Sequence, residues 1–501
     1  MEKTGRKNKG MTTSQSSESL RTLVSRLEKS APLNAEKEAT ELRQRLLSLR
    51  QTLADSTLRW QETDRIFARA MFLVDTQLPL LGKSSFPISR KTRQLVRGLQ
   101  SLLSQLAEDL SDAGEANDKN APPQELRLWR VLRTLSRHLL ISYLTAAPPG
   151  KDIWRLLHQC YRQAQELGVA ENTPPGCPIS LQTLYYSATL LGCAQPSTFT
   201  SLEIAFVADY LELFADQTDP GKGTSPNSPA AFWVDPAQDA PPTAGARKSA
   251  PPETGVHYFS CDRIVELLRN QLDALESGAL PAQIGLPEFA GQAIGRSILR
   301  RLIAYWGTPG KRRFPRRRQS YRAELCSGLD NLWQFFRETP TLPPETSHWM
   351  VINESPDGYA LMHVSGNPGG ISAGDIAAIR TESSDRWQTC IVRWAISENQ
   401  EHLELGLQIL ATQAIPATLT LQLPDKHGAN QLPSLILPST PPLRPLQMLV
   451  VPPGVLATEP KHLVLMIEKS NLELREVKNT SLDEQNSKIE IFSIEPDSHP
   501  S

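Results

Sequence analysis

The chain has 501 residues, of which 39% are hydrophobic and 21% are charged. This length predicts two or three domains, and the composition excludes a wholly disordered protein. The 53 Lys and Arg residues nearly balance the 54 Asp and Glu residues, which excludes a protein that coats nucleic acid through its overall charge. Proline is the unusual residue: 40 of 501, about 8% against roughly 5% in an average protein. We therefore expect many stiff breaks along the chain.

No targeting or metal-binding pattern stands out. The basic residues near Met1 are not followed by an apolar segment, as they would be in a signal peptide, and no run approaches the roughly 18 apolar residues of a membrane span. The six cysteines lie far apart, and neither they nor the nine histidines show metal-ligand spacing. We therefore expect a cytoplasmic protein without a membrane span, metal or cofactor.

The first half of the chain has helical periodicity. Residues 1–16 are predicted to be a disordered N-terminus, and residues 17–216 a helical domain. Leu20, Leu23, Val24 and Leu27, for example, recur at the spacing of one helix face. Prolines interrupt this region, among them Pro32, Pro79 and Pro87, and each is expected to end a helix because its ring nitrogen cannot donate a hydrogen bond.

A change of composition follows the helical domain. Residues 217–255 contain eight prolines and little apolar material, which predicts a linker or a surface excursion. Residues 256–310 return to helical periodicity, and we expect them to pack on the helical domain or to lead into the next one.

The periodicity changes from helix to strand near residue 345. Short runs rich in Val, Ile, Leu and Trp are separated by turn-forming residues, which predicts a small antiparallel barrel over residues 311–415. Residues 328–336 form a candidate helix inserted into it. Strand-like pieces continue in a β-rich C-terminal extension over residues 416–495, and residues 496–501 are expected to be a disordered tail. The predicted fold class is multidomain α plus β.

A dense basic cluster precedes the predicted barrel. Ten basic residues and no acidic residue lie between Arg296 and Arg322. The cluster alone is compatible with a solvated basic face, a nucleic-acid patch or a site for a phosphorylated ligand, since arginine pairs bidentately with phosphate and with the edge of guanine.

A second motif follows the cluster, between two predicted strands. Asn353, Ser355 and Gly358 satisfy the pattern [Asp/Asn]-x-Ser-x2-Gly, and two Arg-x3-Arg pairs lie upstream: Arg312 with Arg316, and Arg313 with Arg317. Farther on, a strand that carries Arg393 precedes the segment Leu403–Gln408, which contains Gly406. Motifs in this order resemble the PilZ family of cyclic di-GMP receptors over about residues 311–415.

The resemblance implies a PilZ-like β-barrel and a ligand, cyclic di-GMP, whose phosphates and guanine edges suit arginine. The binding residues that it implies are Arg312, Arg313, Arg316, Arg317, Asn353, Ser355, Gly358 and Arg393. It leaves open which of the two arginine pairs corresponds to the Arg-x3-Arg motif of the family. It also implies a ligand-operated switch and no catalytic step.

Two functions follow from this pattern. The first is a bacterial cyclic di-GMP effector that couples ligand binding to a helical output or oligomerisation region, with a protein partner or self-association through the helices. The alternative is a degenerate PilZ-like structural or adaptor protein that binds no nucleotide. Because no nucleic-acid reader motif accompanies the basic cluster, we expect no nucleic-acid partner.

Overall fold

The computed structural model describes most of the chain: residues 34–52, 56–112, 122–221, 230–251, 255–310, 314–337, 345–399, 402–422, 429–441, 445–456, 462–468 and 472–496. The predicted disordered N-terminus, the repeat that begins at Leu20 and nearly all of the predicted tail lie outside these ranges.

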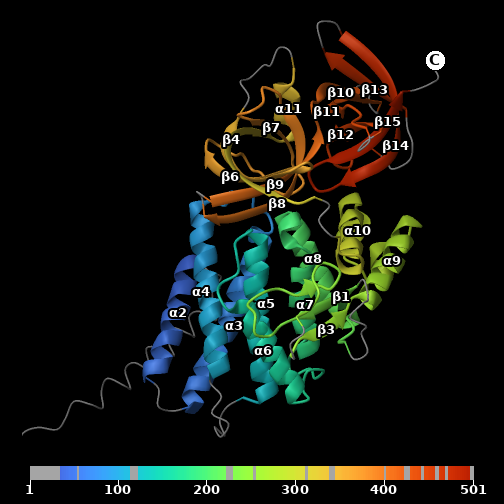
Figure 1. Ribbon diagram of the computed structural model, residues 1–501. Helices are drawn as coiled ribbons and strands as arrows, with labels where there is room; N and C mark the ends of the chain where they lie inside the picture. Colours follow the sequence, from blue (N-terminus) through green and yellow to red (C-terminus); the bar gives the residue numbers. More distant parts are fainter. Residues whose placement is uncertain are drawn as a thin grey trace, which may run out of the picture.

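Helices form one end of the molecule and two β-barrels form the other (Figure 1). The described helices at the helical end are α2 Ala35–Thr52, α3 Ser56–Leu81, α4 Arg90–Asp112, α5 Gln124–Leu144, α6 Ile153–Glu166, α7 Leu181–Cys193, α8 Ser201–Phe214, α9 Asp262–Glu276 and α10 Ala293–Gly307. Short 3-10 turns lie between them: η1 Pro196–Thr198, η2 Ala215–Gln217, η3 Pro281–Ile284 and η4 Glu288–Gly291.

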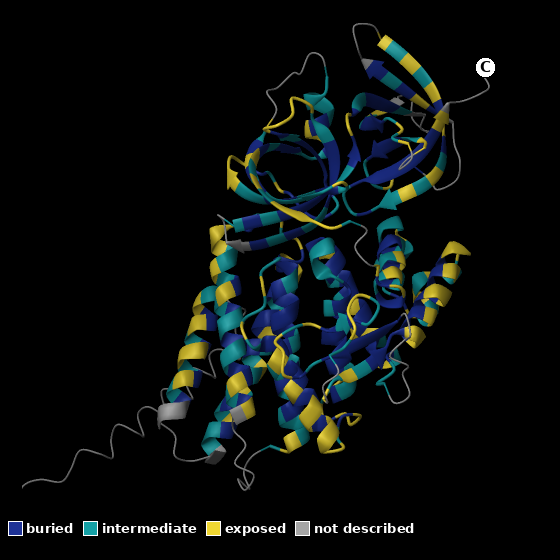
Figure 2. Cartoon of the chain, viewed as in Figure 1, coloured by how far each residue is buried: buried dark blue, intermediate teal, exposed yellow. Residues whose placement is uncertain are grey.

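The helices share one apolar core because each presents an apolar stripe to its neighbours. In α4, for example, Val96, Leu99, Leu103, Leu106 and Leu110 are all at most 1% exposed and recur at intervals of three or four residues. Figure 2 shows the same pattern throughout this end of the molecule, with buried faces turned inward and exposed faces outward.

Pro79 does not end its helix where the sequence predicted a break. It lies inside α3, which continues to Leu81. Because Pro79 is only two residues before the end of the helix, its missing N–H interrupts only the last turn.

The proline-rich stretch contributes to the core of the helical domain. Its strand β1 Ala231–Val234 is buried along its whole length and pairs with β2 Thr243–Ala244 and with β3 His257–Ser260. The ring of Phe232 stacks on that of Phe259, with 5.5 Å between the ring centroids. This part of the stretch is thus packed structure that the composition did not reveal.

The first barrel is closed and antiparallel, with the strand order β4-β5-β6-β9-β8-β7. Its strands are β4 Arg317–Ser327, β5 Ser347–Ser355, β6 Gly358–Ser365, β7 Ile376–Thr381, β8 Gln388–Asn399 and β9 His402–Ala411. Helix α11 Leu329–Phe335 lies between β4 and β5, which confirms the predicted inserted helix.

The C-terminal extension is a second closed barrel, with the order β10-β11-β12-β15-β14-β13. Its strands are β10 Ile415–Gln422, β11 Ala429–Leu437, β12 Gln447–Val451, β13 His462–Glu468, β14 Leu472–Gln485 and β15 Glu490–Pro496. The two barrels share an apolar interface that includes Ile376 and Ile391 of the first barrel and Leu435 and Val450 of the second. The predicted fold class, a helical region followed by an antiparallel barrel and a β-rich extension, is confirmed.

The loop between α3 and α4 reaches into the core of the first barrel. Phe86 and Ile88 are 4% and 3% exposed and belong to the same apolar cluster as Trp349 and Leu405 of that barrel. Phe86 also forms an isolated antiparallel bridge with Ile371. The core of the first barrel therefore includes side chains from the helical domain.

Within the described ranges, no helix combines the length and the apolar character needed to cross a bilayer.

Substitution of Phe86 tests this shared core. Phe86→Ala should lower the free energy of unfolding by about 3–5 kcal/mol, because it removes a buried ring and leaves a cavity. Denaturant unfolding would measure the change. Phe72→Ala is the matched control, since Phe72 is 47% exposed on α3. Equal losses for the two variants would contradict a shared core.

Candidate functional site

The predicted residues Asn353, Ser355, Gly358 and Arg393 lie on neighbouring strands of the first barrel. Asn353 and Ser355 are near the end of β5, Gly358 begins β6, and Arg393 is in β8. Strand β9 lies between β6 and β8 in the barrel. The four residues thus belong to one continuous part of the barrel wall, although 40 positions separate Asn353 from Arg393 in sequence.

The strand register aligns a row of residues across this wall. Asn353 is opposite Ala360, Ala360 is opposite Gly406, and Gly406 is opposite Trp394. On its other side, Asn353 is opposite Arg318 of β4. The row therefore crosses five strands, from Arg318 to Trp394.

This row faces away from the core of the barrel, although Ala360 and Gly406 in its middle are buried. Leu361 and Leu405 point into the core, and side chains alternate along a strand, so Ala360 and Gly406 face outward. Directly opposed residues share a face, so Arg318, Asn353 and Trp394 face outward with them.

Two glycines allow close approach within the wall. A Cβ on Gly406 would lie 1.8 Å from Nε1 of Trp394, so the indole lies directly against the glycine backbone. A Cβ on Gly358 would lie 1.9 Å from the carbonyl oxygen of Leu407. The backbone of β9 thus occupies the space beside Gly358, which is enough to explain a glycine there.

The β5–β6 turn is anchored to β9. The Oγ of Ser355 donates to the carbonyl of Gly358 at 3.3 Å, and the carbonyl of Asp357 accepts from the amide of Ile409 at 2.9 Å. The Nε2 of Gln408 lies 3.4 Å from both carboxylate oxygens of Asp357. These contacts hold the turn next to the side chain of Gln408.

Arg393 has two polar partners from different parts of the chain. Its Nε donates to Oε1 of Gln408 at 2.6 Å, and its Nη1 lies 2.9 Å from Oε1 of Glu484, which belongs to β14 of the second barrel. The polar chain from Asp357 through Gln408 and Arg393 to Glu484 links the β5–β6 turn to the second barrel.

The arginine cluster reaches the same region through β4. Arg317 is opposite Glu354 in the register, and the hydroxyl of Tyr321 donates to the carboxylate of Glu354 at 2.5 Å. Burial, together with this carboxylate, raises the pKa of Tyr321, so the tyrosine remains a neutral donor. Arg316, which is exposed, comes directly before the strand. Arg312 and Arg313 lie outside the described residues.

Sequence reasoning missed Arg318, Trp394 and Gln408. Arg318 was within the basic cluster but outside both Arg-x3-Arg pairs, and only the register places it opposite Asn353. Trp394 and Gln408 were in the quoted segments, but nothing local in the sequence shows that one lies against Gly406 and the other bonds Arg393.

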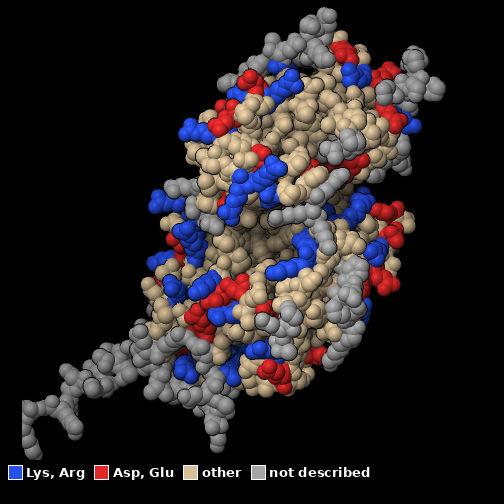
Figure 3. All heavy atoms as spheres, viewed as in Figure 1, with Lys and Arg blue, Asp and Glu red and all other residues tan. Residues whose placement is uncertain are grey.

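A hollow lies between the barrels and the helices. In Figure 3, Lys and Arg side chains border that hollow on the surface in view. Among the described residues, no group of three or more His, Cys, Asp or Glu side chains is arranged to hold a metal ion.

Comparison with known proteins identifies two regions of the chain. Residues 18–222 match the family model described as "Cyclic-di-GMP receptor FimW, N-terminal domain", and residues 337–416 match "Cyclic-di-GMP receptor FimW, middle PilZ domain". The second match contains Asn353, Ser355, Gly358 and Arg393 and begins after the arginine cluster.

A curated relative is the cyclic-di-GMP receptor FimW of Pseudomonas aeruginosa, which is 23% identical over 394 residues. The alignment covers 62% of this chain and 63% of the relative, so it spans less than two thirds of that protein. The two family models together match more than half of this chain, in the order helical region and then barrel. Residues 337–416 therefore form a PilZ domain, and the chain is similar to the FimW receptors in having a large helical region before that domain.

Proposed function

We propose that this protein is a cyclic di-GMP receptor that binds its ligand on the outer face of β4, β5, β6, β9 and β8. The observation that supports this most directly is the row from Arg318 through Asn353 to Trp394, which joins the arginine cluster to the Asn-x-Ser-x2-Gly motif. The curated relative carries the name of a cyclic-di-GMP receptor, and both family models do as well.

The chemistry of this face suits the ligand. Arginines at its β4 edge supply bidentate donors for phosphate and for the Hoogsteen edge of guanine. Asn353, which is half-buried, supplies an amide for hydrogen bonds to a base. Trp394, also half-buried, offers an aromatic surface on which a purine or a guanidinium can stack. We propose the arginine pairs, Asn353, Ser355 and Arg393 as ligand contacts, and Gly358 as the residue that lets β6 lie close to β9.

The same geometry supports coupling of the ligand to the helical domain. The helical domain supplies Phe86 and Ile88 to the barrel core, and the amide of Ser397 in β8 donates to the carbonyl of Ala146 at 2.9 Å. Strand β8 also carries Arg393. A ligand that moves β8 would therefore act on a strand that contacts the helices. We propose a helical output or oligomerisation role on this basis.

One observation favours the alternative, a PilZ-like adaptor that binds no nucleotide. Arg393 is already paired with Glu484 and Gln408, so its guanidinium has partners without a ligand. Direct titration separates the two functions, because an adaptor would show no binding heat.

Asn353 tests the barrel side of the site. Isothermal titration calorimetry of the full chain with cyclic di-GMP should show binding, and Asn353→Ala should weaken it about five- to tenfold, the effect of losing about 1–1.4 kcal/mol of hydrogen bonding. The matched control is Asn331→Ala, because Asn331 lies on α11 and its Nδ2 donates to the carbonyl of Ser327, at the opposite end of β4 from Arg318. No binding heat from the folded wild-type protein would contradict the receptor function.

Paired arginine substitutions test which of the two Arg-x3-Arg pairs contributes to the site. One of the double variants, Arg312→Ala with Arg316→Ala or Arg313→Ala with Arg317→Ala, should lose affinity by about 100-fold or more. Two charge-assisted hydrogen bonds at about 1.5–3 kcal/mol each account for this loss. Calorimetry would measure it. Arg322→Ala, an exposed arginine farther along β4, is the control and should keep the wild-type affinity. Wild-type affinity in both double variants would reject the cluster as part of the site.

A further inference from the structure

The ion pair between Arg393 and Glu484 connects the proposed site to the second barrel. Nη1 of Arg393 lies 2.9 Å from Oε1 of Glu484, and the two side chains are 38% and 27% exposed. The pair is therefore half-buried, where a solvent-borne anion can still reach the arginine. Because Nε of Arg393 is held by Gln408, the guanidinium is fixed in position on the ligand face.

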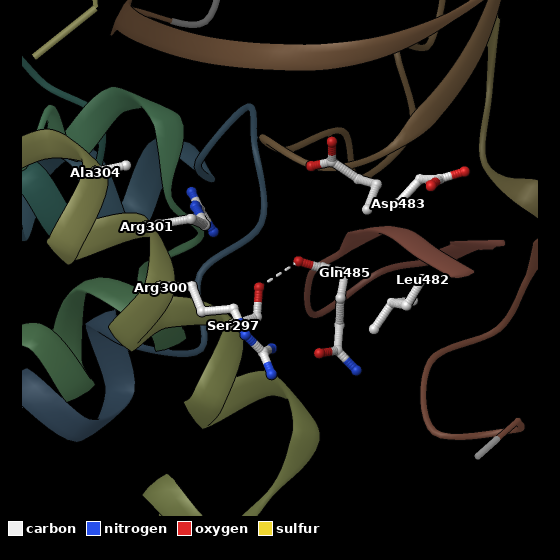
Figure 4. A pocket seen from close by; sticks show the side chains of 8 residues that line it. Ser297, Arg300, Arg301, Ala304, Leu482, Asp483 and Gln485 are labelled. Carbon is white, nitrogen blue, oxygen red and sulfur yellow. Dashed lines mark hydrogen bonds between the residues drawn. The ribbon is translucent and has the colours of Figure 1, made fainter. Parts of the chain in front are cut away.

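The residues that follow Glu484 dock on the other two parts of the molecule. The carbonyl of Gln485 accepts from Oγ of Ser297 in α10 at 2.5 Å, as Figure 4 shows. Nδ2 of Asn486 donates to the carbonyl of Gly374 in the first barrel at 3.2 Å, and the amide of Ser487 donates to Oε1 of Glu203 in α8 at 3.3 Å. A displacement of Glu484 would therefore pull on contacts to both the first barrel and the helices.

The helical side of this contact is rigid. Glu203 is 1% exposed, and its second carboxylate oxygen accepts from the amide of Thr200 at 2.8 Å and lies 3.3 Å from Nη1 of Arg301. The guanidinium of Arg301 lies over the ring of Phe199, with 3.7 Å from its carbon to the ring centroid. A buried carboxylate with these partners favours two discrete states, in which the β14–β15 turn is either bound to Glu203 or released from it.

A cavity next to β14 gives this strand space to move. A cavity of about 490 Å³ separates α10 from β14, and its lining includes Arg300, Arg301, Leu482 and Asp483 (Figure 4). β14 can therefore shift toward α10 without first opening a packed core.

A phosphate of the ligand competes with Glu484 for Arg393. Arginine binds phosphate through two parallel charge-assisted hydrogen bonds, which require the edge of the guanidinium that Glu484 now occupies. A phosphate placed there would also bring a second negative charge next to the Glu484 carboxylate, and the two like charges would repel each other.

We propose that Glu484 is a tethered competitor for the anionic ligand, so that Arg393 and Glu484 form a latch between the two barrels. The latch rests on the proposed function, because it needs a ligand at Arg393. Ligand binding opens it, frees the end of β14, and loosens the docking of residues 485–487 on α8 and α10. The second barrel thus sets the affinity of a site on the first one and transmits its occupancy to the helices.

The test is the affinity of the full-length Glu484→Gln variant for cyclic di-GMP, measured by calorimetry. The variant removes the competing charge and keeps the shape of the side chain, so it should bind about three- to tenfold more tightly than the wild type, as expected for the loss of a partly exposed ion pair. Glu476→Gln is the matched control, because Glu476 is an exposed glutamate on the same strand. It should leave the affinity unchanged.

Amide exchange of the ligand-free proteins gives a second readout. Glu484→Gln should exchange faster than the wild type at residues 485–489, because the latch holds that turn. Unchanged or weaker ligand affinity in Glu484→Gln, with a wild type that binds, would overturn the latch alone. Absence of binding by both the wild type and the variant would overturn the receptor function, and with it the regulatory role of the pair, even if exchange at the turn increased.

Discussion

The turn between β14 and β15 is the contact on which the arrangement of the whole molecule depends. Asn486 donates to Gly374 of the first barrel, and Ser487 donates to the buried carboxylate of Glu203 in the helical domain. Gly374 permits this contact because its φ is +91° and because a Cβ there would lie 2.8 Å from the amide carbon of Asn486. The helical domain and the two barrels therefore meet at one turn through directional hydrogen bonds.

This arrangement determines which surface of the first barrel is available to a ligand. The core contains Phe86 and Ile88 from the helical domain, and Ile391 of the outer wall packs against the second barrel. The face from Arg318 to Trp394 is turned away from the core of the first barrel. In the proposed receptor, a ligand on this face would act on strands that already contact the helices and the second barrel.

Local sequence patterns predicted the order of the elements and four residues of the face, because turn chemistry and strand periodicity are short-range properties. They did not predict Arg318 opposite Asn353 or Trp394 against Gly406, because irregularities after Arg318 and after Val392 shift the register by amounts that alternation alone does not show. Glu484 was also missed, since its partner Arg393 lies 91 positions away. The burial of β1 depends on tertiary packing in the same way, and the composition of residues 217–255 concealed it.

Hydrogen–deuterium exchange of the full chain with and without cyclic di-GMP tests the central claim most directly. We expect saturating ligand to slow exchange in residues 316–321, 351–360, 391–399 and 402–408, which include the proposed face, and to speed exchange in residues 482–489 of the β14–β15 turn. The two opposite changes must occur at the same ligand concentration. Unchanged exchange on the face, or protection confined to other parts of the molecule, would contradict the account.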